Sequence, residues 1–218
     1  MNGLNRSHQS ELFDPAHARP VTVLGVGSVG SHVALQLALL GASKITVWDG
    51  DDVRSHNLPM SMVFGIGDLG RLKVEAVAKR IKAQTDIEIR TVPRMYAGEP
   101  LKGSVVACVD TMKARQLIWE VVRNNPTIDI FVDTRIHERY IVVYSVRPCR
   151  PEDMMEYEAH LYPDSTTPQR TCGAHGIVNV TTVAASLATH ALTRMWSGDI
   201  QAPRQSLLLG DDRLHVYE

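Results

Sequence analysis

The sequence predicts an α/β fold: a doubly wound, mainly parallel β-sheet with helices on both faces and an antiparallel extension. Three observations support this prediction. Short β-branched segments alternate with segments of helical periodicity along the chain. A glycine-rich turn joins the first expected strand to the first expected helix. The segment 105–109 is wholly apolar, as expected for a strand in the middle of a parallel sheet, where both faces are buried.

The first half of the chain alternates between strands and helices. Residues 20–25 are β-branched and alternate, which predicts a strand, and residues 28–40 place Val33 and Leu37 at helical spacing. Gly41 then provides a stop signal for that helix. The other elements expected in this half are a strand at 44–48, a helix with one apolar face at 71–83, and strands at 87–92 and 105–109.

The second half continues the alternation and then becomes less regular. We expect a helix at 111–123, strands at 128–134 and 140–146, a helix of small residues at 178–196 and a last strand at 213–217. Irregular structure is expected in an N-terminal arm at 1–19 with a short helix, a long loop at 51–70 and a mobile crossover at 148–169. Residues 20–218 are predicted to form a single nucleotide-binding domain.

Composition excludes several classes of protein. The formal net charge of −1 gives no basic excess for nucleic acid, and no apolar run approaches the roughly 20 residues that span a bilayer. The polar N-terminus does not resemble a secretory signal. Three cysteines make neither a disulfide framework nor a four-cysteine zinc site. We therefore expect a cytoplasmic protein that has no membrane or nucleic-acid partner.

The glycine-rich turn predicts a nucleotide site. Gly25, Gly27 and Gly30 form a G-x-G-x-x-G motif between a strand and a helix, where the glycines allow a tight turn, close approach of phosphate and close helix packing. Asp49 follows about 20 residues later, at the end of the second strand, where a carboxylate binds ribose hydroxyls. These features indicate a Rossmann-like fold, but NAD, FAD and ATP all use this turn.

The residues after Asp49 favour ATP activation over hydride transfer. Asp51, Asn57 and Lys73 add an acid, an amide and a cation, and a cation offsets the charge that builds on a pyrophosphate leaving group. Asp110 ends the apolar strand, in the crevice where α/β sheets bind ligands, and offers a carboxylate to Mg²⁺.

A purely structural interpretation also exists for Lys73, Asn57 and Asp110. Lys73 would be a solvated helix lysine, Asn57 a turn former, and Asp110 the N-cap of the helix that starts at Thr111. Their joint occurrence favours the nucleotide site.

Five sequence blocks resemble the E1-like superfamily, which includes ThiF, MoeB and the ubiquitin-activating enzymes. The blocks are GVGSVGSH, WDGDDVRSHNL, GRLKVEA, ACVDTMKAR and RTCGAHGIVNV, and together they extend over nearly the whole chain. The resemblance implies that ATP adenylates the C-terminal carboxylate of a ubiquitin-like or sulfur-carrier protein of the β-grasp type. It also implies a homodimer, and some members then transfer the acyl group to a cysteine.

The resemblance also implies roles for individual residues. Asp49 would hold the ribose, Asn57 and Lys73 the phosphates, and Asp110 the Mg²⁺ ion, while Asp51 would lie near the reacting phosphate. In the N-terminal arm, Arg6 would match an arginine that family dimers insert into the neighbouring site.

The chain departs from the family pattern at two places. Where the family has an arginine after the Asn-Leu pair, this chain has Met60, which removes a bidentate positive charge from the phosphate site. Arg54 and Arg71 flank the same loop, and either would be a substitute; alternatively, adenylation is slow or a partner supplies the arginine. The zinc-binding cysteine pairs of many members are also missing.

Cys172 is the candidate acyl acceptor. It follows Arg170, precedes His175 and lies just before the last long helix, and a nearby arginine and helix N-terminus both favour a thiolate. The alternative is a small buried cysteine. Cys108 lies within an apolar segment and is expected in the core, whereas Cys149 has a polar context and no accompanying base.

The sequence therefore predicts an ATP- and Mg²⁺-dependent adenylyltransferase of the ubiquitin-like modifier activating type. A nucleotide-binding module without turnover is the alternative that Met60 favours. An NAD-dependent enzyme is disfavoured by Lys73 and Asp110, and an RNA-modifying relative is disfavoured by the absence of basic excess.

Overall fold

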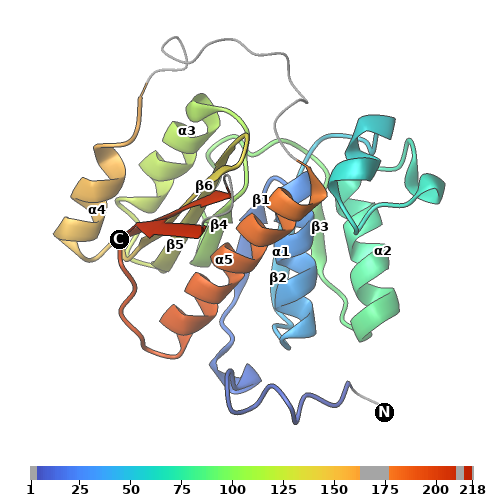
Figure 1. The fold of residues 1–218 in the computed structure, drawn as a ribbon, viewed down its shortest axis with the longest axis horizontal. Coiled ribbons are helices and arrows are strands. Elements are labelled where there is room, and N and C mark those ends of the chain that lie inside the picture. Colours follow the sequence, from blue (N-terminus) through green and yellow to red (C-terminus); the bar gives the residue numbers. More distant parts are fainter. Residues whose placement is uncertain (1–3, 163–176, 210–213, 218) are drawn as a thin grey trace.

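A computed structural model describes residues 4–162, 177–209 and 214–217 of the 218-residue chain. Its centre is an eight-stranded sheet with the order β3-β2-β1-β4-β5-β6-β7-β8 (Figure 1). The first five strands in this order are parallel, and the last three are antiparallel. The strands are β1 (Val21–Leu24), β2 (Ile45–Trp48), β3 (Arg90–Val92), β4 (Gly103–Ala107), β5 (Ile128–His137), β6 (Tyr140–Val146), β7 (Arg204–Leu209) and β8 (Leu214–Tyr217).

Helices cover both faces of the sheet, as predicted. On one face lie α1 (Ser28–Leu39), α2 (Lys73–Thr85) and α5 (Val178–Trp196); on the other lie α3 (Met112–Val122) and α4 (Pro151–Glu158) (Figure 1). The doubly wound, mainly parallel α/β fold with an antiparallel extension is therefore confirmed. Within the described part of the chain, no helix is both long and apolar enough to cross a bilayer.

The order of the strands creates a crevice at the carboxyl end of β1. Strand β1 pairs with β2 on one side and β4 on the other, and Leu24 is in register with both Trp48 and Ala107. The chain therefore changes direction across the sheet between β3 and β4, which is the point where open α/β sheets bind ligands. The residues that follow these three strands all emerge at the same edge.

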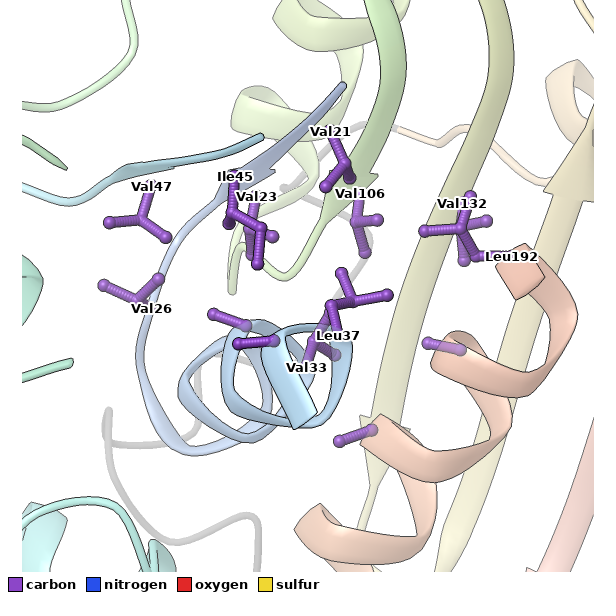
Figure 2. Packing of buried hydrophobic residues seen from close by; sticks show 14 of the residues in the cluster. Val21, Val23, Val26, Val33, Leu37, Ile45, Val47, Val106, Val132 and Leu192 are labelled. Carbon is purple, nitrogen blue, oxygen red and sulfur yellow. The ribbon is translucent and has the colours of Figure 1, made fainter. Parts of the chain in front are cut away.

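The larger core lies between the sheet and helices α1, α2 and α5. Figure 2 shows Val33 and Leu37 of α1 beneath Val23 and Val106 of the sheet, and Leu192 of α5 beside Val132. Helix α5 presents alanines to this core, and small side chains let it lie close to α1; the alanines are Ala184, Ala185, Ala188 and Ala191. This packing fixes α1, and with it the glycine turn at its N-terminus.

The opposite face has an aromatic core. The Trp119 ring of α3 lies 4.7 Å from the Tyr157 ring of α4, and Phe131 of β5 lies 5.6 Å and 5.2 Å from those two rings. Edge and tilted arrangements of this kind add to the burial of large apolar area. The core anchors α4 against the sheet.

Two expectations about the second half of the chain were wrong. The segment expected to be irregular at 148–169 contains α4, where Pro151 occupies the first turn and Glu152 and Asp153 add the acids that favour a helix N-terminus. Residues 163–169 lie outside the described residues. The strand β7 was not predicted, because its sequence RQSLLL does not alternate; pairing with β6 and β8 determines it.

Smaller differences concern the limits of elements. The segment 51–70 contains two short 3₁₀ helices, η2 (Ser55–Met60) and η3 (Ile66–Asp68), instead of continuous loop. Strand β3 begins at Arg90, later than expected, and β5 continues to His137, beyond the expected end at 134. The short helix expected in the N-terminal arm is present as a third 3₁₀ helix, η1 (Pro15–His17).

Candidate nucleotide site

The glycine turn has the geometry of a phosphate cradle. A Cβ atom on Gly25 would lie 2.7 Å from the Cys108 carbonyl oxygen, and one on Gly30 would lie 1.9 Å from the Gly25 carbonyl oxygen. Gly25 also has a φ of 82°, which favours glycine. A Cβ on Gly27, however, would meet nothing within 4 Å. Two glycines are thus required by packing, while Gly27 faces space that a ligand can occupy.

Asp49 joins the second strand to this turn. One carboxylate oxygen accepts the Val26 N–H at 2.8 Å, and the other accepts the Asp51 N–H at 2.9 Å. Burial raises the pKa of the Asp49 carboxyl, and the Lys73 ammonium and these two N–H groups oppose the rise. The side chain is therefore held rigidly at the carboxyl edge, beside the glycine turn.

Lys73 joins the two acids. Its Nζ donates to Asp51 Oδ2 at 2.7 Å and lies 3.9 Å from Asp49 Oδ1, and the residue is only 8% exposed. Its backbone N–H also donates to the Asp51 carbonyl at 2.9 Å, next to a β-bridge between Asp52 and Leu72. This short antiparallel contact closes the segment between the acids and α2, and it brings residues 22 positions apart into one cluster.

Asn57 is placed in the same segment by local hydrogen bonds. Its Oδ1 accepts the Arg54 N–H at 2.8 Å, and its own N–H donates to the Arg54 carbonyl at 2.8 Å. Asn57 is 8% exposed, so it caps η2 from a buried position. Its amide Nδ2 has no hydrogen-bond partner among the described residues, which leaves a donor for a ligand.

Asp110 emerges after β4 at the same edge, three residues beyond Ala107, and is exposed. It does not cap the next helix: Thr111 is the N-cap of α3, and its Oγ1 accepts the Ala114 N–H at 3.2 Å. The interpretation of Asp110 as the N-cap of α3 is therefore wrong.

A buried ion network lies behind Asp110. The carboxylate of Asp133 is fully buried and accepts Arg115 Nε at 3.1 Å, Arg135 Nε at 2.8 Å and the Tyr157 hydroxyl at 3.1 Å. Arg115 Nη2 also donates to the Val109 carbonyl, directly before Asp110. Arg135 and Asp133 form an ion pair, and both residues lie within β5.

Two hydrogen bonds that the sequence did not predict connect α1 to the segment after η2; we call this pair of contacts the clasp. His32 accepts the Met62 N–H on Nε2 at 3.0 Å and bonds the Ser28 carbonyl through Nδ1 at 2.6 Å, so the neutral ring carries its proton on Nδ1. Ser31 and Ser61 share a hydrogen bond of 2.9 Å. Burial lowers the pKa of His32. The GSH that ends the glycine motif was the only signal in the sequence.

Arg6, which was singled out from the sequence, lies apart from this cluster. Arg6 donates to the carbonyls of Leu39 and Ala38 at the C-terminus of α1, about 18 Å along the helix from the glycine turn. Met60 ends η2, and its carbonyl accepts the Thr181 hydroxyl of α5 at 2.9 Å; its side chain supplies no cation. Cys172, with its neighbours Arg170 and His175, lies outside the described residues.

The two described cysteines differ from each other. Cys108 follows the end of β4 and is partly buried, so its expected place within a strand was wrong; burial raises the pKa of its thiol to about 12. A thiol of this kind is not a nucleophile at neutral pH. Cys149 is exposed, as its polar context suggested.

The donor set fits a magnesium nucleotide better than a metal held by protein alone. Within the described residues, no group of three or more His, Cys, Asp or Glu side chains could hold a metal ion. Mg²⁺ needs no such group, because it usually takes one or two carboxylates and completes its shell with phosphates and water. Asp110 would supply a carboxylate, and the open space at Gly27 would admit the phosphates.

Known proteins are similar to this chain in sequence and in fold. The ThiF family model matches residues 9–211. The sulfur carrier protein ThiS adenylyltransferase of Escherichia coli (strain K12) is 28% identical over 215 residues, which cover 94% of this chain and 81% of that protein. The structure of PaaA matches with a TM-score of 0.72 at 20% identity, and that of E. coli MccB with ATP matches with 0.69 at 17%.

These structural matches extend over most of this chain but over a smaller share of each matched protein. It matches over 91% and 94% of its residues, and spans 63% of the PaaA chain and 64% of the MccB chain. These low identities show the fold alone, whereas the family model extends over nearly the whole sequence and includes the glycine turn, the Asp49–Lys73 cluster and Asp110. The chain therefore belongs to the ThiF family, within the E1-like superfamily.

Proposed function

We propose that this protein uses ATP and Mg²⁺ to adenylate the C-terminal carboxylate of a ubiquitin-like or sulfur-carrier protein. The observation that carries the proposal is the cluster of Asp49, Asp51 and Lys73 beside the open space at Gly27. A hydride-transfer site has no use for a lysine held between two acids at the phosphate edge. The similarity to the ThiS adenylyltransferase supports the same chemistry.

In this reaction a carboxylate oxygen of the substrate attacks the α-phosphorus of ATP, and the bond to the β-phosphate breaks to release pyrophosphate. Asp49 would bind the ribose hydroxyls, and Gly27 would let the phosphates approach the backbone at the N-terminus of α1. Asn57 and Lys73 would contact the phosphates, Asp51 would lie near the reacting phosphate, and Asp110 would hold Mg²⁺.

We extend the proposal to two further steps. Cys172 would attack the acyl carbon of the adenylate as a thiolate, forming a thioester as AMP leaves. In a homodimer, Arg6 would reach the neighbouring site only after leaving the carbonyls of Ala38 and Leu39, to which it donates within its own chain. Replacement of Cys172 by Ser would then abolish the thioester while adenylation continues.

The test is ATP–pyrophosphate exchange with a panel of small β-grasp proteins that end in Gly-Gly. We expect exchange that depends on one partner and on Mg²⁺, and that falls at least about 100-fold in Asp110→Ala. ATP binding without exchange across the panel would favour a binding module, an alternative supported by the absence of a cation at Met60. Preference for NAD⁺ over ATP in a calorimetric titration would refute the proposal.

A further inference from the structure

The nucleotide site carries more negative than positive charge before any ligand arrives. Asp49, Asp51, Asp52 and Asp110 contribute carboxylates at this edge. The charge of Lys73 is already offset, because its Nζ lies 2.7 Å from Asp51 and 3.9 Å from Asp49. A triphosphate therefore needs a second cation from the protein, in addition to any bound metal ion.

Most of the nearby arginines are committed to other partners. Arg71 lies 3.9 Å from the Asp68 carboxylate, and Arg80 donates to the carbonyls of Val63 and Met62. Arg94 pairs with Glu99 and lies over the Trp48 ring, and Arg115 is buried against Asp133. In the described part of the chain, the Arg54 guanidinium has neither an ion pair nor a hydrogen bond, and it is exposed.

Two hydrogen bonds hold the backbone of Arg54, whereas its guanidinium has no hydrogen-bond or ion-pair partner among the described residues. Its N–H donates to Asn57 Oδ1, and its carbonyl accepts the Asn57 N–H, both at 2.8 Å. A 3₁₀ helix has three residues per turn, so the N-cap Arg54, Asn57 and Met60 lie in one line along η2. Arg54 follows Asp51 by three residues. Its long side chain thus starts from the same side of η2 that carries the buried amide of Asn57.

We propose that Arg54 is the arginine that contacts the β- and γ-phosphates of ATP in this protein, in place of a cation at position 60. Its planar guanidinium would donate two hydrogen bonds to phosphate oxygens, and its charge would stabilise the departing pyrophosphate. Arg54 thereby determines selectivity for a triphosphate over a monophosphate. The inference rests on the function proposed above, because it assumes that ATP is the ligand.

The experiment compares ATP and AMP, because only ATP has the phosphates that Arg54 would contact. We would titrate the full chain with Mg²⁺–ATP and with AMP by calorimetry, for the wild type, Arg54→Ala, Arg54→Lys and Arg71→Ala. Arg71 is the matched control, because it is an exposed arginine of the same segment that already pairs with Asp68. Thermal melts without ligand would verify that Arg54→Ala stays folded, as expected for an exposed side chain.

For Arg54→Ala we expect ATP to bind about tenfold more weakly while AMP binds within about twofold of the wild type. Arg54→Lys keeps the charge but loses the planar fork, so its loss should be about threefold. Arg71→Ala should change neither affinity. Where a partner supports exchange, the rate constant of Arg54→Ala should fall about 100-fold.

Three outcomes would overturn the inference and leave the proposed function standing. Equal ATP affinity in Arg54→Ala and the wild type would show that Arg54 makes no phosphate contact. Equal losses for ATP and AMP would indicate a structural effect, and Arg54→Lys as weak as Arg54→Ala would exclude a role of charge. Wild-type protein that binds no ATP would instead refute the proposed function itself, and the inference with it.

Discussion

Replacement of Lys73 by Met should destabilise the protein in a manner that depends on pH. The Lys73 Nζ lies 3.9 Å from the Asp49 carboxylate, and at an effective dielectric constant of about 20 this distance corresponds to about 4 kcal/mol of attraction. The contact with Asp51 adds little, because that carboxylate is 46% exposed. The variant recovers the cost of burying the ammonium, so we expect a net loss of about 1–3 kcal/mol at pH 7.

The pH dependence follows from Asp49. Burial already raises the pKa of its carboxyl, with Lys73 as the largest opposing influence, and the variant would raise it further. A carboxyl whose folded pKa is raised destabilises the fold at high pH, and this cost disappears as the pH falls and the group is protonated. The difference in unfolding free energy should therefore be largest at pH 8 and smaller at pH 5.

Urea denaturation of the wild type and Lys73→Met at pH 8, 7, 6 and 5 would measure this difference. Asp49→Asn provides the control, because Lys73→Met should cost less in that background, where no buried carboxylate remains. A loss that is constant across the pH range, or equally large in Asp49→Asn, would refute the assigned electrostatic coupling.

Three further predictions concern the glycine turn, the clasp and the buried ion network. Gly27→Ala should fold normally but bind ATP poorly, whereas Gly30→Ala should lose folded structure, because its Cβ would lie 1.9 Å from the Gly25 carbonyl oxygen; circular dichroism and calorimetry separate the two effects. The pKa of His32 is lowered in the folded state, so its contribution to stability is complete above about pH 6.5 and is lost as the pH falls toward the lowered value. In His32→Ala the urea denaturation midpoint should therefore depend less on pH between pH 5 and 6.5 than in the wild type. Asp133→Asn should cost about 3 kcal/mol or more in urea denaturation, because Arg115 and Arg135 would lose their buried counter-charge. The exposed pair Lys82–Asp86 is the control, and Asp86→Asn, at a left-handed position that Asn tolerates, should leave the midpoint unchanged.

The parts of the fold that follow a strong local pattern could be predicted from the sequence. Periodicity located the strand–turn–helix unit at Val21–Leu39 and the helix α5, because buried faces repeat at the period of the element. It missed β7, because pairing with neighbouring strands and not a local pattern determines that strand. It also missed α4, because its sequence has no clear helical pattern and packing of Tyr157 in the aromatic core holds the helix.

In the candidate site, too, only the residues that belong to a local sequence pattern could be predicted. The motif glycines and Asp49 could be found because their spacing is fixed by one strand–turn–helix unit. The bond of His32 to Met62 joins residues 30 positions apart, and the network of Asp133 joins three elements, so no local pattern reveals either. The availability of Arg54 likewise depends on which partners occupy the other arginines, and only the folded chain shows that.

Oxygen isotopes test most directly whether a substrate carboxylate attacks the α-phosphorus of ATP. A partner protein that supports exchange would carry ¹⁸O in both oxygens of its C-terminal carboxylate, and the AMP released after turnover would be analysed by mass spectrometry. Adenylation places one of these oxygens between carbon and phosphorus, and cleavage of the acyl bond leaves it on AMP. We expect AMP that carries one ¹⁸O atom; unlabelled AMP, or ADP with phosphate as the products, would contradict adenylation of the carboxylate.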